Sequence, residues 1–233
     1  MRFLASLMFL LMLMNPVIAH ADHAEDAWAK ASPSIVSVLP TWPGYEKPGL
    51  GAPPGTAPEG SGVAVLAEGL ILTAAHVVSK ATSVQVRDHE NTVADAEVLA
   101  IDGASDLALL RVALPVPPIS VAATRPAPGS HACVIANAFG LGLSISCGIV
   151  SADRRTGIGF NPIEDFIQTD AAANPGSSGG ALVNEAGELI GLVSAIFTMQ
   201  SDANAGVNFA ASTDLIDARI EWMRARFGLN NLD

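Results

Sequence analysis

The sequence has 233 residues, half of them hydrophobic, and a formal net charge of −11. This length suffices for one or two domains with a buried core. Glycine and proline occur 21 and 15 times and aromatic residues make up only 5%, which favours many short strands and turns over a helical bundle. Lysine and arginine are scattered and form no basic stripe, so the composition argues against nucleic acid and anionic lipid as partners.

The first 21 residues have the three parts of a secretory signal. Arg2 supplies the positive start, residues 3–14 form an apolar run, and Ala19 and Ala21 offer small side chains to a signal peptidase. The alternative is a retained membrane anchor, but the apolar stretch of about 17 residues is shorter than the ~20 that a span requires. We therefore expect a signal peptide over 1–21 and a periplasmic mature protein without stable membrane insertion.

The first half of the chain predicts a series of short strands, at 34–39, 62–66, 70–73, 84–86, 94–100 and 107–112. The segment 40–60 between the first two is rich in proline and glycine and predicts a long loop. Such a loop is either functional or an inert insertion, and both interpretations stay open. Residues 75–79 predict a short turn that follows the third strand.

A proline-rich connection over 114–129 leads to a second series of strands, at 132–136, 144–150, 166–168, 188–193 and 207–209. The last element has a helical period, because Ile216, Ile220 and Met223 recur at helical spacing after the candidate N-cap Ser212 and before Gly228. Two series of short strands and one closing helix predict an all-β fold of two packed antiparallel barrels.

Two cysteines, Cys133 and Cys147, lie at equal distances from Gly140. If the segment between them turns a hairpin, they face each other on paired strands, and a disulfide there would stabilise the fold by about 3 kcal/mol. The alternative is a pair of small buried hydrophobic side chains. His131 lies two residues before Cys133, but one such pair is too little for a zinc site. We expect no metal and no cofactor.

The most informative stretch is Gly176 to Gly180, which has the letters GSSGG. Its glycines allow a turn that presents a serine hydroxyl next to backbone amides, and such amides can bind a developing oxyanion. A serine nucleophile also needs a histidine base and a carboxylate that orients the base. His76 and Asp106 occur upstream in suitable contexts. The alternative, an inert loop rich in glycine and serine, would be favoured only if the serine motif stood alone.

Three motifs resemble the HtrA/Deg serine proteases of the chymotrypsin-like fold: SDLAL at 105–109, FGLGxSxSxGIVS at 139–151 and QTDAAxNPGxSGGALVN at 168–184. The resemblance implies two six-stranded antiparallel β-barrels with a C-terminal helix. It implies a protease domain over 22–233, with barrels at about 32–115 and 128–211 and a helix over 212–227. It makes His76 the general base, Asp106 its orienting partner and Ser178 the nucleophile, with an oxyanion hole at Gly176, Ser177 and Ser178.

The resemblance also implies how substrate binds. It aligns six residues with substrate-binding positions, and these are Ala173, Ser194, Ala195, Ile196, Phe197 and Val207. The edge 194–196 would pair with an extended substrate. Ala172 offers no anion to a basic side chain, so we expect cleavage after small or medium aliphatic residues. Ser177 stands where trypsin-type zymogens carry aspartate, which argues against activation by amino-terminal cleavage.

The family suggests polypeptide substrates, specifically unfolded or misfolded proteins, and a homo-oligomer that is a trimer by analogy. PDZ domains commonly follow the protease domain in this family, and we expect none here. Two alternatives to quality control stay open. One is a processing protease with a single target, and the other is a chaperone-like holder with latent or partner-activated proteolysis.

Overall fold

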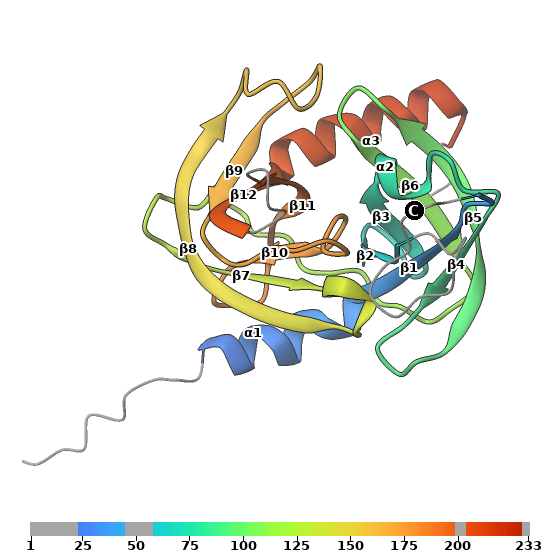
Figure 1. Cartoon of the computed structure of the whole chain (residues 1–233), viewed down its shortest axis with the longest axis horizontal. Helices are drawn as coiled ribbons and strands as arrows, with labels where there is room; N and C mark the ends of the chain where they lie inside the picture. The colour runs from blue at the N-terminus through green and yellow to red at the C-terminus, as the bar shows by residue number, and fades with distance from the viewer. Residues whose placement is uncertain (1–22, 45–57, 199–203, 230–233) are drawn as a thin grey trace, which may run out of the picture.

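The computed structural model describes residues 23–44, 58–198 and 204–229, which form two closed six-stranded β-barrels followed by a helix (Figure 1). The first barrel has the order β1-β2-β3-β6-β5-β4 and the second β10-β11-β12-β9-β8-β7, and the barrel strands pair antiparallel. The predicted chymotrypsin-like fold is confirmed.

The bounds of the elements agree with the predicted order. The first barrel consists of β1 (Ile35–Thr41), β2 (Gly60–Ala64), β3 (Leu70–Ala74), β4 (Ser83–Arg87), β5 (Val93–Asp102) and β6 (Leu107–Val112). The second consists of β7 (His131–Ala136), β8 (Ser144–Arg155), β9 (Phe166–Thr169), β10 (Ala181–Val183), β11 (Leu189–Thr198) and β12 (Asn204–Ser212). The helices are α1 (His23–Ala31), α2 (Ala75–Val78) and α3 (Thr213–Phe227), with short 3-10 turns at Ser32–Ser34 and Ala138–Gly140.

The C-terminal helix α3 has both predicted caps. Ser212 accepts a hydrogen bond from the Leu215 N–H on its side-chain oxygen at 3.2 Å, and Gly228 adopts the left-handed conformation with φ of 71°. These caps satisfy backbone groups that a helix end would otherwise leave unpaired. In Figure 1 the helix extends from the second barrel across to the first, and it contacts β5 of the first barrel as well as β11 and β12 of the second.

The loop predicted over 40–60 differs from the structure at its start, because β1 includes Pro40 and Thr41. Proline cannot donate a ladder hydrogen bond, so it is tolerated where a strand has a neighbour on only one side. Pro40 is placed in this way, since it pairs with Val84 of β4 while the pairing of β1 with β2 ends at Val38. Residues 45–57 of the predicted loop and residues 1–21 of the predicted signal peptide lie outside the described residues.

The two barrels share one apolar core. Ile35, Leu72 and Leu107 of the first barrel belong to the same buried cluster as Ile135 and Phe166 of the second. Each of these side chains is fully excluded from solvent. Burial of a side chain of this size contributes about 1.5–3 kcal/mol. The packing therefore holds the barrels together as one body and fixes the cleft between them.

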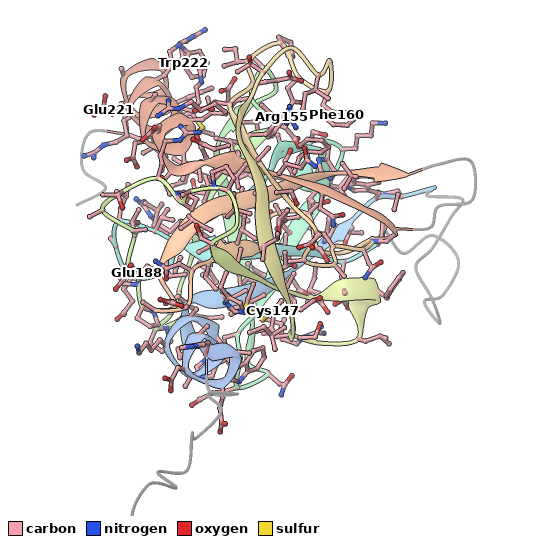
Figure 2. The ribbon with its side chains drawn as sticks, turned by 90° about the vertical axis from the view of Figure 1, so that its left-hand side faces the viewer. Cys147, Arg155, Phe160, Glu188, Glu221 and Trp222 are labelled. Atoms are coloured by element: carbon pink, nitrogen blue, oxygen red, sulfur yellow. A yellow bond between two sulfur atoms is a disulfide. The ribbon has the colours of Figure 1, made fainter. Side chains whose placement is uncertain are left out.

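The cysteine pair lies on the two strands of the second barrel that α1 contacts, with Cys133 buried and Cys147 exposed. Cys133 of β7 is directly opposite Cys147 of β8, and the two sulfur atoms form a disulfide. Figure 2 labels Cys147 beside the amino-terminal helix. Ala27 of α1 is buried in the same cluster as Cys133. The disulfide thus links two neighbouring strands at the place where the first helix packs.

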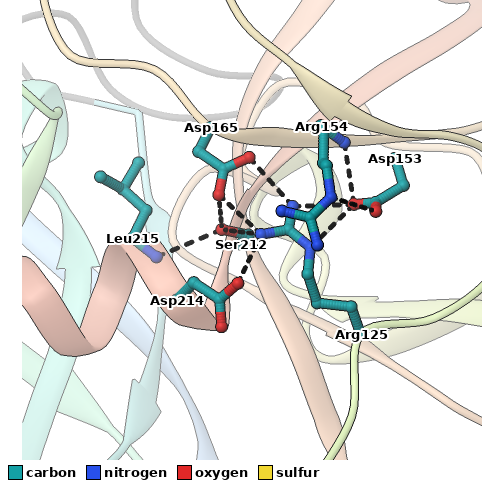
Figure 3. Close-up of polar contacts among 7 residues, drawn as sticks. All are labelled: Arg125, Asp153, Arg154, Asp165, Ser212, Asp214 and Leu215. Atoms are coloured by element: carbon teal, nitrogen blue, oxygen red, sulfur yellow. Dashed lines mark hydrogen bonds and ion pairs between the residues drawn. The ribbon is translucent and has the colours of Figure 1, made fainter.

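A cluster of charges joins the inter-barrel connection to the second barrel and α3 (Figure 3). Arg125 donates hydrogen bonds of 2.7 to 2.9 Å to the carboxylates of Asp153, Asp165 and Asp214. Its side chain is only 11% exposed. The hydrogen bonds from Arg125 lower the pKa of Asp165, against the effect of burial, which raises it. One guanidinium therefore binds carboxylates from three different segments.

Replacement of Arg125 by alanine should strongly destabilise the fold. The change leaves three carboxylates close together with only the exposed Arg154 beside them, and removal of one partner from a buried ion pair typically costs about 3–5 kcal/mol. We expect a decrease of this size in the free energy of unfolding, measured by denaturant titration at pH 7. Arg154→Ala is the control, because Arg154 contacts Asp153 at 3.4 Å but is 69% exposed, so its loss should cost less than about 1 kcal/mol.

The same cluster predicts a pH dependence. The pKa of Asp165 is lower in the folded protein than the ordinary value, so its contribution is complete above about pH 4, the range of a free aspartate. The contribution is lost as the pH falls through the lower folded pKa. The stability difference between the wild type and Arg125→Ala should therefore shrink on acidification below about pH 4. A difference that stays constant down to pH 2 would contradict this account of the cluster.

Candidate active site

His76 is positioned by the junction between β3 and the short helix α2. It is the second residue of α2, and its side chain is 51% exposed. The His76 ring nitrogen Nδ1 lies 2.8 Å from Oδ2 of Asp106, and the His76 backbone N–H donates to Oδ1 of the same carboxylate at 2.9 Å. A ring whose Nδ1 donates to a carboxylate carries its basic lone pair on Nε2. The pair is thus arranged to present a proton acceptor.

Asp106 lies in the turn between β5 and β6 and has a positive φ of 59°. Aspartate tolerates this left-handed conformation better than most residues with a side chain. The Asp106 carboxylate also accepts a hydrogen bond of 3.0 Å from the hydroxyl of Ser194, which belongs to β11 of the second barrel. Its side chain is 13% exposed. The carboxylate is therefore held by donors from both barrels.

The turn that contains Ser178 needs glycine at two positions. Gly176 and Gly179 have φ of 94° and 84°. A Cβ atom on Gly179 would lie 2.1 Å from the carbonyl oxygen of Ser61, and one on Gly176 would lie 2.4 Å from that of Asn137. Side chains are therefore excluded by conformation and by space. The turn lies directly against other backbone, which fixes its shape.

Ser61 of β2 connects the first barrel to this turn. Its hydroxyl donates to the carbonyl of Gly176 at 2.8 Å and accepts from the N–H of Asn137 at 2.8 Å. Its backbone N–H donates to the carbonyl of Ser178 at 2.9 Å. Ser61 is fully buried. The position of Ser178 thus depends on a residue of the barrel that carries His76.

Two backbone amides of the turn are available for a substrate oxygen. Within the described part of the chain, no residue accepts a hydrogen bond from the N–H of Gly176 or of Ser178. The carbonyl of Pro175 accepts from the Phe139 N–H at 2.6 Å. Because the peptide bond is trans, its N–H on Gly176 points away from that contact.

Ser177 is a correction to the predicted oxyanion hole. The Ser177 N–H donates to the carbonyl of Asn174 at 2.8 Å, and its hydroxyl accepts from the Asn174 N–H at 3.1 Å. Both groups close the turn internally, and Ser177 is only 2% exposed. The amides that can meet a substrate oxygen are therefore those of Gly176 and Ser178.

His76 and Ser178 line the same cavity, which has a volume of about 190 Å³. His76 comes from the first barrel and Ser178 from the second, so the cavity lies where the barrels meet. Its other walls come from Trp42, Val77 and from residues 58–60 and 175–176. The structure therefore brings the three predicted catalytic residues to one place, with Asp106 behind His76.

The predicted substrate-binding residues are placed differently from one another. Ser194 is buried with its hydroxyl on Asp106, so its side chain supports the carboxylate. Ala173 is completely buried in the core of the second barrel, and Val207 packs on a separate cluster. For Ala195, Ile196 and Phe197 only the strand β11 itself is described. The role of these six residues in substrate binding stays a prediction.

The backbone of β11 nevertheless has an open side. β10 pairs with β11 only as far as Leu192, whereas β12 continues to pair with Ala195 and Ile196 on the other side. No other described strand takes the place of β10 there. The segment 194–196 can therefore accept an additional strand, and its role in substrate binding stays a prediction.

Sequence reasoning missed the supporting residues of the site. Ser61, Asn137 and Glu59 surround the Ser178 turn, and Glu59 accepts hydrogen bonds from Arg87 at 2.7 Å and from Asn137 at 2.6 Å. No local motif marks Glu59 or Ser61. Their importance arises from barrel register, which places β2 next to the turn.

Comparison with known proteins shows the family to which the chain belongs. The sequence model of the trypsin-like peptidase domain matches residues 60–192. The fold is similar to a solved structure of the HtrA-type protease AlgW with a tripeptide, with a TM-score of 0.77 and 33% identity over 88% of this chain and 64% of that one. A structure of AlgW with a decapeptide has a TM-score of 0.74 and 32% identity, over 87% of this chain and 67% of that one. The chain belongs to the HtrA-type trypsin-like serine proteases.

Curated relatives of this HtrA-type chain include the periplasmic serine endoprotease DegP of Salmonella typhimurium, which is 41% identical over 163 residues. They also include the periplasmic pH-dependent serine endoprotease DegQ of Escherichia coli, which is 38% identical over 160 residues. Each match covers 67% of this chain, but only 34% of DegP and 35% of DegQ. The chain therefore spans about a third of the length of these relatives.

Replacement of Ser61 by alanine should loosen the Ser178 turn. The change removes the donor to the Gly176 carbonyl and the acceptor for Asn137, and unsatisfied buried partners cost about 1–3 kcal/mol. We expect the free energy of unfolding to fall by this amount in a denaturant titration. Thr82→Ala is the matched control, because its hydroxyl makes an exposed hydrogen bond to Thr41. Equal effects of the two variants would contradict the supporting role of Ser61.

Proposed function

We propose that this HtrA-type chain is an exported serine endopeptidase that hydrolyses peptide bonds of unfolded or misfolded proteins. His76, Asp106 and Ser178 form its catalytic triad. The observation that carries the proposal is the cavity between the barrels, which His76 and Ser178 both line. Asp106 binds the ring of His76, and the N–H groups of Gly176 and Ser178, in the turn that carries the nucleophile, have no acceptor among the described residues.

The geometry supports a mechanism in two stages. Nε2 of His76 takes the proton of the Ser178 hydroxyl as its oxygen attacks the scissile carbonyl. The carbonyl oxygen gains negative charge and is bound by the N–H groups of Gly176 and Ser178. Protonated His76 then donates its proton to the leaving amine, and an acyl-enzyme on Ser178 remains.

The second stage regenerates the enzyme. A water molecule gives its proton to Nε2 of His76 while its oxygen attacks the acyl carbon on Ser178. Collapse of the tetrahedral intermediate releases the new carboxyl end and returns the proton to the Ser178 oxygen. Throughout, the Asp106 carboxylate keeps the ring orientation and stabilises its positive charge.

Substrate recognition follows from the open side of β11. An extended polypeptide can add to the backbone at 194–196, which requires substrate segments that are not folded into their own secondary structure. This requirement supports unfolded proteins as the substrate class. The similar AlgW structures with a tripeptide and a decapeptide support peptide binding as well. With no anion at Ala172, a small or medium aliphatic residue would precede the cleaved bond.

Export and a periplasmic location are supported by the signal-like residues 1–21 and by the periplasmic relatives. The disulfide between Cys133 and Cys147 suits an oxidising compartment. None of the described helices is sufficiently long and apolar to cross a bilayer. The trimer suggested by the family remains part of the proposal and is testable by sedimentation.

Replacement of Ser178 by alanine should abolish proteolysis. Loss of a serine nucleophile lowers turnover by about a millionfold. We would incubate the chain and Ser178→Ala with a chemically unfolded model protein and identify the products by mass spectrometry. The wild type should give many fragments that end in small or medium aliphatic residues.

Other outcomes separate the alternatives. A few cuts at one sequence would favour a processing protease. If the wild type and Ser178→Ala are equally inactive as proteases and equally suppress aggregation of the model protein, the enzyme proposal fails and the holder is supported. Cleavage by both variants at the same rate would assign the activity to a different nucleophile.

A further inference from the structure

The turn over 102–106, which carries Asp106, is organised by a second carboxylate. Asp102 accepts hydrogen bonds from the N–H of Ala104 and the hydroxyl of Ser105. These contacts close the turn directly before Asp106 and leave Asp102 only 3% exposed. A carboxylate buried to this degree needs a cation as well as hydrogen bonds.

The cation comes from α3, at the far end of the sequence. Nε of Arg219 lies 2.7 Å from Oδ2 of Asp102. The Arg219 side chain is 15% exposed, and its guanidinium carbon lies 4.3 Å from the ring centroid of Trp222. Figure 2 labels Trp222 on this helix. Trp222 therefore restricts the guanidinium, which reduces the entropy lost when the ion pair forms.

Asp102 is ionised at neutral pH. Burial raises the pKa of its carboxyl group, but the hydrogen bonds from Ser105, Arg219 and Ala104 together lower it below the usual value. The contact with Arg219 is therefore a charge-assisted hydrogen bond, which is stronger than one between neutral groups.

The turn has two further contacts outside its own barrel. The N–H of Ile163, in the loop between β8 and β9, donates to the carbonyl of Ala104 at 2.9 Å. Ser194 of β11 donates to Asp106 itself. The segment is thus covalently part of the first barrel, yet the second barrel and α3 hold it at Asp102, Ala104 and Asp106.

We propose that Arg219 and Asp102 are positioning residues, which hold the turn of Asp106 in place and thereby set the Asp106–His76 pair against Ser178. This inference rests on the proposed catalytic triad. His76 and Asp106 are on one barrel and Ser178 is on the other, so their alignment depends on contacts that bridge the barrels. A displacement of about 1 Å at a reacting group can cost about 100-fold in rate.

A contact that merely stabilised the fold would not lower the catalytic rate of a protein that is still folded. The chain offers a matched comparison on the same helix. Asp214 of α3 pairs with Arg125 at 2.7 Å and is 62% exposed. Arg125 also contacts Asp153 and Asp165 of the second barrel. The Asp214 pair therefore joins α3 to the second barrel and does not reach the turn of Asp106.

The test compares Arg219→Gln, Arg219→Lys, Asp102→Asn and the control Asp214→Asn in the full chain. Two rates are measured at a temperature where circular dichroism shows each variant folded. One is the rate constant for modification of Ser178 by a fluorophosphonate probe. The other is turnover of a peptide that spans a cut site found in the unfolded model protein, with kcat and KM determined separately.

Arg219→Gln and Asp102→Asn should reduce kcat and the probe rate by about 10- to 100-fold, with KM within about twofold of the wild type. Arg219→Lys keeps the charge and should recover part of the loss, while Asp214→Asn should stay within about twofold. Unchanged rates in folded Arg219→Gln and Asp102→Asn would overturn the positioning role. So would an equal loss in Asp214→Asn.

The two levels of the proposal fail in different ways. A wild type that neither cleaves the peptide nor reacts with the probe would refute the proposed function, and the positioning role with it. A reactive wild type whose Arg219 and Asp102 variants keep full activity would refute the positioning role alone.

Discussion

The carboxylate of Asp106 receives hydrogen bonds from three donors, and these donors determine how the rest of the site is assembled. One oxygen accepts from the backbone of His76, and the other accepts from the His76 ring and from the hydroxyl of Ser194. A carboxylate so fully occupied cannot rotate without losing several contacts at once. The histidine is thereby held in one tautomer and one orientation. Because Ser194 belongs to the second barrel, the hydrogen bonds of the Asp106 carboxylate are complete only when the two barrels are correctly packed against each other.

A reciprocal contact runs in the other direction. Ser61 of the first barrel holds the turn of Ser178 in the second, just as Ser194 holds Asp106 in the first. Each half of the candidate triad is thus supported by a serine from the opposite barrel. The shared apolar core brings the barrels together without directional preference. The hydrogen bonds from the buried hydroxyls of Ser61 and Ser194 fix the orientation of one barrel relative to the other. The hydrophobic effect thus holds the barrels together, while the hydrogen bonds of Ser61 and Ser194 define the geometry of the site.

The sequence predicted the features that depend on neighbouring residues. The glycines around Ser178, the caps of α3 at Ser212 and Gly228, and the two series of strands all follow from local preferences. Features that depend on strand register and on contacts between distant segments could not be predicted from the sequence. The hydrogen bonds of Ser61 arise only when β2 lies against the 174–180 turn, and Arg219 meets Asp102 across a separation of 117 residues. The family resemblance places the Ser177 amide in the oxyanion hole, whereas in the structure this N–H donates to the carbonyl of Asn174.

The distribution of the triad over two closed barrels has a consequence for how this protein is studied in solution. Each barrel closes its own ladder of backbone hydrogen bonds. Far-ultraviolet circular dichroism therefore reports the strand content and is nearly insensitive to how the two barrels pack against each other. Chemistry at Ser178, in contrast, depends on how the two barrels pack against each other. A preparation whose barrels are intact but slightly misaligned would give a native spectrum together with a low titre of reactive serine. The fraction of molecules with a reactive Ser178 is therefore the sensitive measure of native assembly. The fraction that is folded by circular dichroism gives only an upper limit for it.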